Sequence, residues 1–162
     1  MARRSYTPCA GGAHDSRRAA RRRRGARSLI GQLGYPTSAD AVRERVERLW
    51  SSEADRLVVA ELDGEVIGLA SLHISLSIAY DEPAAKLTGI VVDERHRRRG
   101  VGQALVEELE REAERRGCCV VFLTTSGRRE DAHAFYKRIG FEETGRRFTK
   151  QFGSTCALAR ET

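Results

Sequence analysis

The chain has 162 residues, enough for one domain with a single hydrophobic core. Charged residues make up 32% of it, and no apolar run approaches the roughly 20 residues that a membrane span requires, so no membrane partner is expected. The basic N-terminus lacks the apolar segment of a secretory signal, and a cytoplasmic location is therefore expected.

The net charge of +6 is concentrated at the N-terminus. Residues 1–28 hold nine arginines and one acid, which leaves 20 basic and 22 acidic side chains in the rest of the chain. Because that remainder is slightly acidic, no basic face for nucleic acid is expected on the folded domain. Nucleic-acid binding is predicted only through the arginine-rich tail.

Residues 1–28 are rich in Arg, Ala, Gly and Ser and contain few large apolar side chains. Such a segment buries little surface, which predicts a disordered, basic, low-complexity tail. A mis-assigned gene start is a second interpretation, since another reading frame of a GC-rich gene gives this composition. The apolar residues from Ala19 to Leu33 also follow helical spacing, which indicates a helix from about Ser16 to Gly34.

A helix and a β-hairpin are expected next. The helix has a capping residue at Thr37 or Ser38 and one apolar face, formed by Val42, Val46 and Leu49. Strands are expected at 57–62 and 66–76, because both runs are rich in apolar and β-branched residues. The Asp63-Gly64 pair between them favours a type I′ turn, which joins two antiparallel strands.

The middle of the chain predicts a buried strand followed by an amphipathic helix. After a polar loop at 77–83, residues 86–92 form a nearly continuous apolar run, as in a strand at the centre of a sheet. A helix is expected over 100–117, with Gly117 as its C-terminal stop. Its apolar residues recur every four positions: Val101, Leu105, Leu109 and Ala113.

The C-terminal part predicts a further strand at 118–124 and a helix at 130–139 closed by Gly140. Two antiparallel strands are then expected, at 141–144 and 147–152. The order of these elements predicts an α/β (α+β) fold with a mixed sheet.

The four cysteines are Cys9, Cys118, Cys119 and Cys156. None has the paired spacing of a zinc or redox site, so free thiols and no metal site are expected. An acyl-cysteine mechanism would need a His and an acid paired with the thiol, and the sequence has no such pattern.

The turn at 93–99, between strand and helix, carries the clearest chemistry. Gly100 and Gly102 let the backbone approach a ligand closely, and the helix N-terminus attracts anions. Three arginines at 97–99 add positive charge, so the segment predicts a pyrophosphate cradle. A dinucleotide-binding fingerprint would need glycine where Leu105 stands, and a Walker loop would need Gly-Lys-Ser/Thr. By itself, the turn is also compatible with a solvated basic loop.

Two segments resemble the GNAT superfamily of N-acetyltransferases. Arg97, Gly100 and Gly102 match the signature Gln/Arg-x-x-Gly-x-Gly/Ala, after a strand that reads Leu-Thr-Gly-Ile-Val-Val-Asp. A second segment, Ala-His-Ala-Phe-Tyr-Lys-Arg-Ile-Gly-Phe, follows at 132–141. The resemblance spans about 29–152, and it implies a mostly antiparallel mixed sheet that is splayed at the acetyl-CoA site and flanked by helices. Residues 153–162 would form a C-terminal tail.

The resemblance implies that acetyl-CoA is the co-substrate. Strand backbone would pair with the pantetheine arm, the turn would hold the pyrophosphate, and Tyr136 would protonate the departing CoA thiolate. The residues implied in cofactor binding are Ile90, Val91, Val92, Arg97, Arg98, Arg99, Gly100, Val101, Gly102 and Gln103.

The implied function is direct transfer of an acetyl group, in a ternary complex, to a primary amine of a small molecule or peptide. The base that takes the proton of the amine is not defined by a motif, and Glu61, His73 and Asp81 are candidates by their place on strands or a loop. The family often has an asparagine where this chain has Arg129, and Thr124, Thr125 or Ser126 would have to replace it.

An alternative is a non-catalytic acyl-CoA-binding module with a degenerate N-terminus, because residues 1–28 show no convincing first strand. A homodimer would be in keeping with the superfamily.

Overall fold

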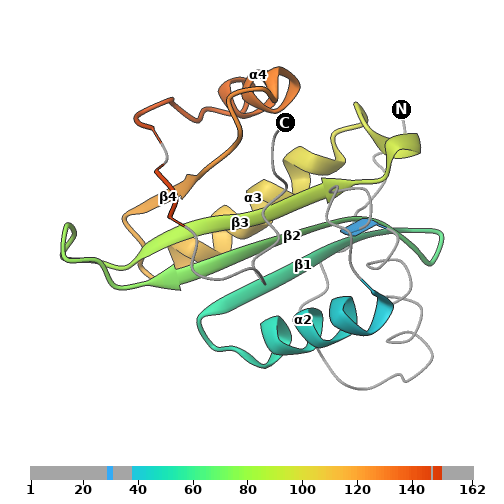
Figure 1. Ribbon diagram of the computed structural model, residues 1–162, viewed down its shortest axis with the longest axis horizontal. Coiled ribbons are helices and arrows are strands. Elements are labelled where there is room, and N and C mark those ends of the chain that lie inside the picture. The colour runs from blue at the N-terminus through green and yellow to red at the C-terminus, as the bar shows by residue number, and fades with distance from the viewer. Residues whose placement is uncertain (1–28, 31–37, 147, 151–162) are drawn as a thin grey trace.

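The computed structural model describes residues 29–30, 38–146 and 148–150 (Figure 1). Among these residues, no helix combines the length and apolar character that crossing a membrane demands. The elements in chain order are α2 (Ala39–Ser51), β1 (Asp55–Leu62), β2 (Glu65–Ser75), β3 (Ala84–Val92), the 3-10 helix η1 (Glu94–His96), α3 (Val101–Arg115), β4 (Val120–Leu123) and α4 (Glu130–Arg138).

The four strands form one mixed sheet in the order β1-β2-β3-β4. The first three are antiparallel neighbours, and β4 lies parallel to β3 because α3 carries the chain back across the sheet. At the β1–β2 turn, Asp63 and Gly64 both have positive φ, of 52° and 79°, as a type I′ turn requires. The predicted mixed α/β sheet and its first hairpin are therefore confirmed.

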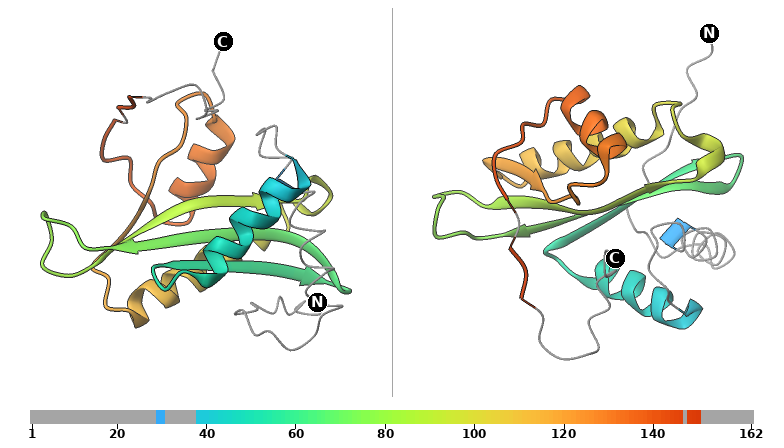
Figure 2. Two further views of the ribbon diagram at one scale, coloured as in Figure 1. Left: turned by 60° about the horizontal axis from the view of Figure 1, so that its bottom comes forward. Right: turned by 45° about the horizontal axis from the view of Figure 1, so that its top comes forward.

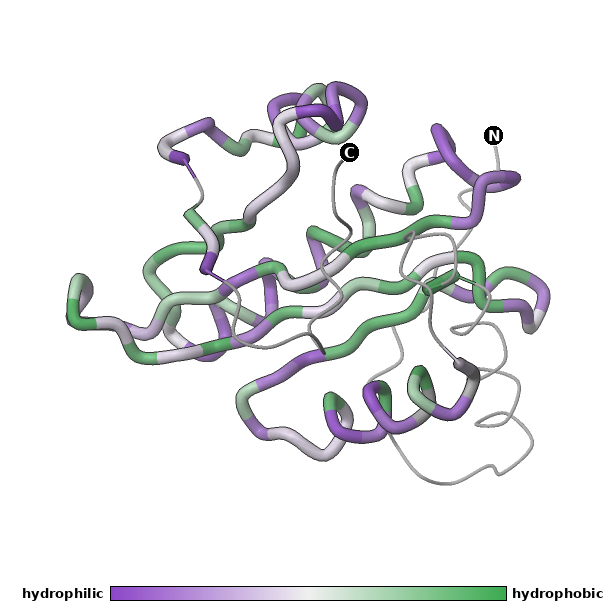
Figure 3. The backbone as a smooth tube through the Cα atoms, viewed as in Figure 1, coloured by the Kyte–Doolittle hydropathy of each residue, from purple (hydrophilic) through white to green (hydrophobic). Residues whose placement is uncertain are grey.

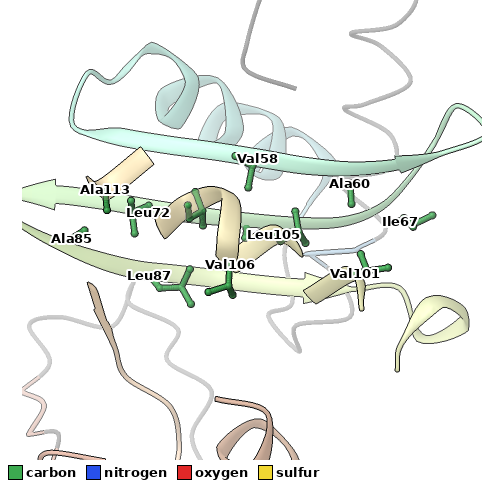
Figure 4. Packing of buried hydrophobic residues seen from close by; sticks show 12 residues of the cluster. Val58, Ala60, Ile67, Leu72, Ala85, Leu87, Val101, Leu105, Val106 and Ala113 are labelled. Atoms are coloured by element: carbon green, nitrogen blue, oxygen red, sulfur yellow. The ribbon is translucent and has the colours of Figure 1, made fainter. Parts of the chain in front are cut away.

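Helices cover the sheet on both faces: α2 lies on one side, and α3 and α4 lie on the other (Figure 2). Alternate side chains of each strand point to opposite faces, so β1 and β2 supply apolar groups to both layers. The cluster on the α3 side is shown in Figure 4 and includes Val58, Ala70, Leu72, Leu87, Val101, Leu105 and Leu109. The cluster on the α2 side contains Leu29, Val42, Val46, Leu57, Val59, Val66, Leu69 and Val91.

The prediction of strands at 141–144 and 147–152 was wrong for the residues of this segment that the structure describes. Residues 141–146 and 148–150 form no strand, while residues 147, 151 and 152 lie outside the described residues. The physical reason is that Glu142, Glu143 and Arg146 are exposed and supply no alternating apolar face to bury. Phe148 is 94% exposed and does not supply one either.

Two other predictions need adjustment. The strand expected at 118–124 is shorter and covers only Val120–Leu123. Of the helix expected from Ser16 to Gly34, Leu29 and Ile30 are helical, and the rest lies outside the described residues. The expected tails at 1–28 and 153–162 also lie outside them.

Candidate functional site

Strand β3 has β4 as a neighbour along only part of its length. The two strands pair from Ala84 with Val120 to Leu87 with Leu123, and the pairing ends there. In the described part of the chain, residues 88–92 have no strand on that side, and Figure 1 shows β4 beside only the first part of β3. The backbone of residues 88–91 on this edge is therefore available to pair with an extended ligand, while the Val92 carbonyl accepts a hydrogen bond from Arg97 Nε at 3.1 Å.

A β-bulge lies at the point where β3 and β4 separate. Ser71 of β2 pairs with Gly89 and Leu72 pairs with Leu87, so that Thr88 is the extra residue on β3. The Ser71 and Thr88 hydroxyls are 2.7 Å apart, and Thr88 Oγ1 also donates to the Ser71 carbonyl at 3.2 Å. A bulge bends its strand, and this hydroxyl pair joins β3 to β2 beside the point where the pairing of β3 with β4 ends.

The turn after β3 is held by Asp93, which is buried. Its carboxylate accepts the Arg95 backbone N–H at 2.9 Å and two bonds from the Arg95 guanidinium, each at 3.1 Å. The hydrogen bonds from Arg95 lower the pKa of Asp93 to about 2, against the opposing effect of burial. Its own N–H donates to the Ile67 carbonyl at 2.9 Å, which connects the turn to β2.

Left-handed backbone follows at Arg98, with a φ of 58°, and at Gly100, with a φ of 82°. Gly100 precedes the first residue of α3 and supplies no side-chain cap, so the first N–H groups of the helix are not bonded by a cap. Arg97 donates from Nε to the Val92 carbonyl at 3.1 Å, which holds the arginine turn against the end of β3. Figure 3 shows this turn as a hydrophilic segment next to the hydrophobic end of β3.

These features fit the pyrophosphate of a coenzyme. Uncapped helix amides, a partial positive charge at the helix N-terminus and exposed arginines all favour a bound anion. The edge of β3 at 88–92 leads directly to this anion site. An extended arm on the edge and a phosphate group at the helix can therefore belong to one ligand.

Helix α4 packs against the start of α3 through Phe135, whose ring faces Gly102. The next residue, Tyr136, makes edge-to-face contacts with Phe135 and Phe141, at centroid distances of 5.2 and 5.7 Å. Burial raises the pKa of the Tyr136 phenol, with a smaller opposing effect from Arg129. The phenol therefore keeps its proton at neutral pH and can act as a proton donor.

The structure brings the expected cofactor residues together at one end of β3. Ile90 and Val92 pack toward α3, Val91 packs toward α2, and residues 97–103 form the turn and the first part of α3. Tyr136 packs on the same core cluster as Ile90 and Val92. These placements are compatible with the expected roles, which remain predictions.

The three candidate bases do not lie together. Glu61 is near the end of β1 beside the Asp63-Gly64 turn, and Asp81 is exposed in the loop between β2 and β3. His73 is on β2, where its Nδ1 lies 2.9 Å from Asp55 Oδ1. Sequence reasoning missed Asp55, because 18 residues separate the pair and only the strand register brings them together.

Other side chains considered from the sequence have structural contacts. His133 Nε2 lies 2.9 Å from the Ser126 carbonyl. Burial raises the pKa of the Cys118 thiol, which opposes formation of a nucleophilic thiolate. Across the residues that are described, no three His, Cys, Asp or Glu side chains gather as a metal site would require.

A family model described as "Acetyltransferase (GNAT) family" matches residues 20–141. An aminoalkylphosphonate N-acetyltransferase of Salmonella typhimurium is 34% identical over 88 residues, which cover 54% of this chain and 57% of that protein. An aminoglycoside N(6')-acetyltransferase type 1 of Stenotrophomonas maltophilia is 30% identical over 117 residues, or 69% of this chain and 75% of its own length. The chain spans only 42% and 43% of two further relatives, from Methanocaldococcus jannaschii and Mus musculus.

Solved structures of acetyltransferases also resemble this chain. The aminoglycoside N-acetyltransferase AAC(6')-Iy, in complex with a bisubstrate analog of CoA and acetylneamine, superposes with a TM-score of 0.72 at 27% identity. The match covers 82% of this chain and 92% of that one. A GNAT family acetyltransferase from Staphylococcus aureus, at 19% identity and a TM-score of 0.73, has the same fold. It covers 92% of this chain and is matched over 100% of its own length.

Proposed function

Because this chain belongs to the acetyltransferase (GNAT) family, we propose that it transfers an acetyl group from acetyl-CoA to a primary amine of a small molecule. The observation that carries this proposal is that an open strand edge and an anion-binding helix end meet after β3. The edge of β3 at 88–92 has no β4 partner, and it leads into the uncapped N-terminus of α3. An arm bound along the first and a pyrophosphate bound at the second would form one continuous coenzyme site.

In this proposal, backbone groups of β3 pair with the pantetheine arm, and the turn with the start of α3 binds the pyrophosphate. A β-strand rises about 3.3 Å per residue, so the edge at 88–92 offers roughly 16 Å to an extended arm. The residues assigned to the coenzyme are Ile90, Val91, Val92, Arg97, Arg98, Arg99, Gly100, Val101, Gly102 and Gln103.

The chemistry follows from placing the thioester beside Tyr136. Attack by a neutral amine forms the N–C bond, the nitrogen gives one proton to a base, and loss of the thiolate breaks the C–S bond. The Tyr136 phenol, kept protonated by its burial, donates the proton that the sulfur needs. No enzyme nucleophile is needed for this direct transfer, which agrees with the raised pKa of Cys118.

The acceptor is proposed from the relatives. One is named for aminoalkylphosphonates and another for aminoglycosides, and both kinds of compound are small molecules that carry amines. A non-catalytic acyl-CoA-binding module is less well supported, since these relatives are named as enzymes.

We further propose that residues 29–152 form the transferase domain and that the protein acts in the cytoplasm. A homodimer also remains a proposal.

The test is release of CoA thiol from acetyl-CoA across a panel of amines, together with calorimetric binding of CoA. The panel should contain an aminoalkylphosphonate, an aminoglycoside, a polyamine and a peptide with a free N-terminus. We expect amine-dependent thiol release with at least one acceptor. CoA binding without thiol release across the panel would support the binding module instead.

A matched pair of variants locates the coenzyme. Arg98→Glu reverses a charge in the turn and is expected to weaken CoA binding about tenfold, with a loss that shrinks at high salt. Arg111→Glu makes the same change farther along α3, where Arg111 pairs with Glu108, and should bind CoA like the unaltered protein. Equal losses in both variants would contradict a pyrophosphate site at the turn.

A further inference from the structure

A histidine and a carboxylate are paired across β1 and β2, outside the coenzyme site. His73 Nδ1 lies 2.9 Å from Asp55 Oδ1, and the two residues are direct partners in the antiparallel register. The Asp55 side chain is 18% exposed and the His73 side chain is 43% exposed. A neutral imidazole that donates from Nδ1 to a carboxylate carries its lone pair on Nε2, so the pair defines a proton acceptor.

The pair lies on the α2 side of the sheet. Asp55 alternates with Leu57 along β1, and His73 alternates with Leu69 along β2, and both leucines belong to the cluster on that side. Tyr136 packs on the cluster of the opposite, α3 side. A proton acceptor and a proton donor therefore lie on opposite faces of the same sheet.

The register also places His73 near the start of the splay. His73 pairs with Lys86 of β3, and Lys86 pairs with Phe122 of β4. The next pair, Leu87 with Leu123, is the last one before the two strands separate. His73 thus lies on the strand that neighbours β3, and β3 separates it from the position where the unpaired edge begins.

The present inference rests on the proposed function, in which the coenzyme binds along the edge of β3 and at the start of α3. With the pyrophosphate at the start of α3, the arm runs along the edge of β3 from Val92 toward Thr88. The thioester at its far end would then lie where β3 and β4 begin to pair. An amine that attacks from the α2 face would meet the thioester on the side where His73 stands.

We propose that His73 is the general base of the acetyl transfer and that Asp55 positions its imidazole. The amine nitrogen forms a bond with the thioester carbon and gives one proton to His73 Nε2. The C–S bond breaks, and the sulfur takes the proton of the Tyr136 phenol. The imidazolium then loses its proton to water and the phenolate regains one, so the enzyme returns to its first state and an amide and CoA are released.

The surroundings favour His73 over the other two candidates. Glu61 lies at the other end of β1 from Asp55, far from the start of the splay. Asp81 is exposed in the loop between β2 and β3, and no described contact orients its side chain. The titratable side chains beside His73 in the register are Asp55 on β1 and Lys86 on β3, while β4 contributes Phe122.

The experiment compares His73→Gln and Asp55→Asn with a matched control, Glu108→Gln. The control also removes a carboxylate from a hydrogen-bonded pair, here with Arg111 on the exposed face of α3. We expect His73→Gln to lower kcat about 100-fold and Asp55→Asn about tenfold, with CoA binding and the circular dichroism spectrum unchanged. Glu108→Gln should retain the activity of the unaltered protein.

Two further measurements separate a base from a structural histidine. The pH profile of kcat/KM for His73→Gln should lose one of the limbs that the unaltered protein shows. The loss of rate in this variant should shrink at high pH, where the amine is already neutral. Nitrogen NMR of labelled histidine should show the His73 ring protonated on Nδ1, and Asp55→Asn should change that signal without any substrate present.

The outcomes are distinct. An active unaltered protein whose rate and pH profile survive His73→Gln would overturn the role of His73 and leave the proposed function standing. A protein that transfers acetyl to no amine would overturn both. A proton on Nε2 of His73, with Nδ1 unprotonated, would overturn the role of Asp55 even if transfer is observed.

Discussion

Gly102 at the start of α3 lies against the ring of Phe135 on α4: a β-carbon at Gly102 would stand 3.4 Å from Cζ and 3.5 Å from Cε2. Val92 Cγ2 would be 3.7 Å from the same β-carbon. This contact connects the proposed pyrophosphate site to the helix that carries Tyr136. The position has room for a methyl group at ordinary contact distance and no room for a branched side chain.

Gly102→Val is therefore expected to push Phe135 and α4 away from α3. Overpacking of this kind costs about 1–3 kcal/mol, and we expect CoA affinity to fall at least tenfold. Gly102→Ala is the smaller change for comparison, and its loss of affinity should be smaller, because its single methyl group meets only ordinary contacts with the protein. Calorimetric titration with CoA measures both variants, and equal affinities would show that the contact does not shape the site.

Thr88→Val should weaken the bulge at the splay. The substitution keeps the shape of the side chain but removes the bond to the Ser71 carbonyl and leaves the Ser71 hydroxyl without this partner. We expect a loss of about 2 kcal/mol in the free energy of unfolding, measured with urea, and weaker binding of CoA. Thr88→Ser should restore both, while Thr144→Val, at an exposed position, should change neither.

Asp93 should make the stability of the protein depend on acid pH. Its pKa falls from 3.8 when unfolded to about 2 when folded, so the folded state binds its proton less readily. The resulting stabilisation is fully present above the unfolded pKa and is lost as the pH falls through 3.8 toward about 2. Melting temperatures measured from about pH 5 to pH 2 should fall less steeply for Asp93→Asn. Parallel curves for the two proteins would contradict this assignment.

Tyr136→Phe tests the proton donor. We expect kcat to fall about 100-fold while CoA affinity is retained, because the ring contacts with Phe135 and Phe141 do not involve the hydroxyl. Since burial raises the pKa of Tyr136 above 10.0, the unaltered protein should lose no rate through this group at neutral pH. Tyr80→Phe, in the exposed loop between β2 and β3, is the control. An unchanged rate in Tyr136→Phe would refute the acid role.

The sequence was sufficient where the interactions are local. The Asp63-Gly64 turn, the four-residue period of α3 and the glycine-containing turn before it all depend on residues close together in the chain. The two strands predicted at 141–144 and 147–152 were wrong over the described residues. No alternating apolar face exists there, and the described residues remain unpaired with the sheet.

Only the tertiary structure decided which distant residues meet. The pairing of His73 with Asp55 requires the β1–β2 register, and a shift of that register by one residue would place the two side chains on opposite faces. The bulge at Thr88 and the end of pairing at Leu123, which lie side by side at the splay, depend on the register of three strands at once. The spacing of apolar residues predicted the helices and strands, because each of them buries one apolar face. The site depends on the register between strands and on their curvature, which arise only when distant segments pack together.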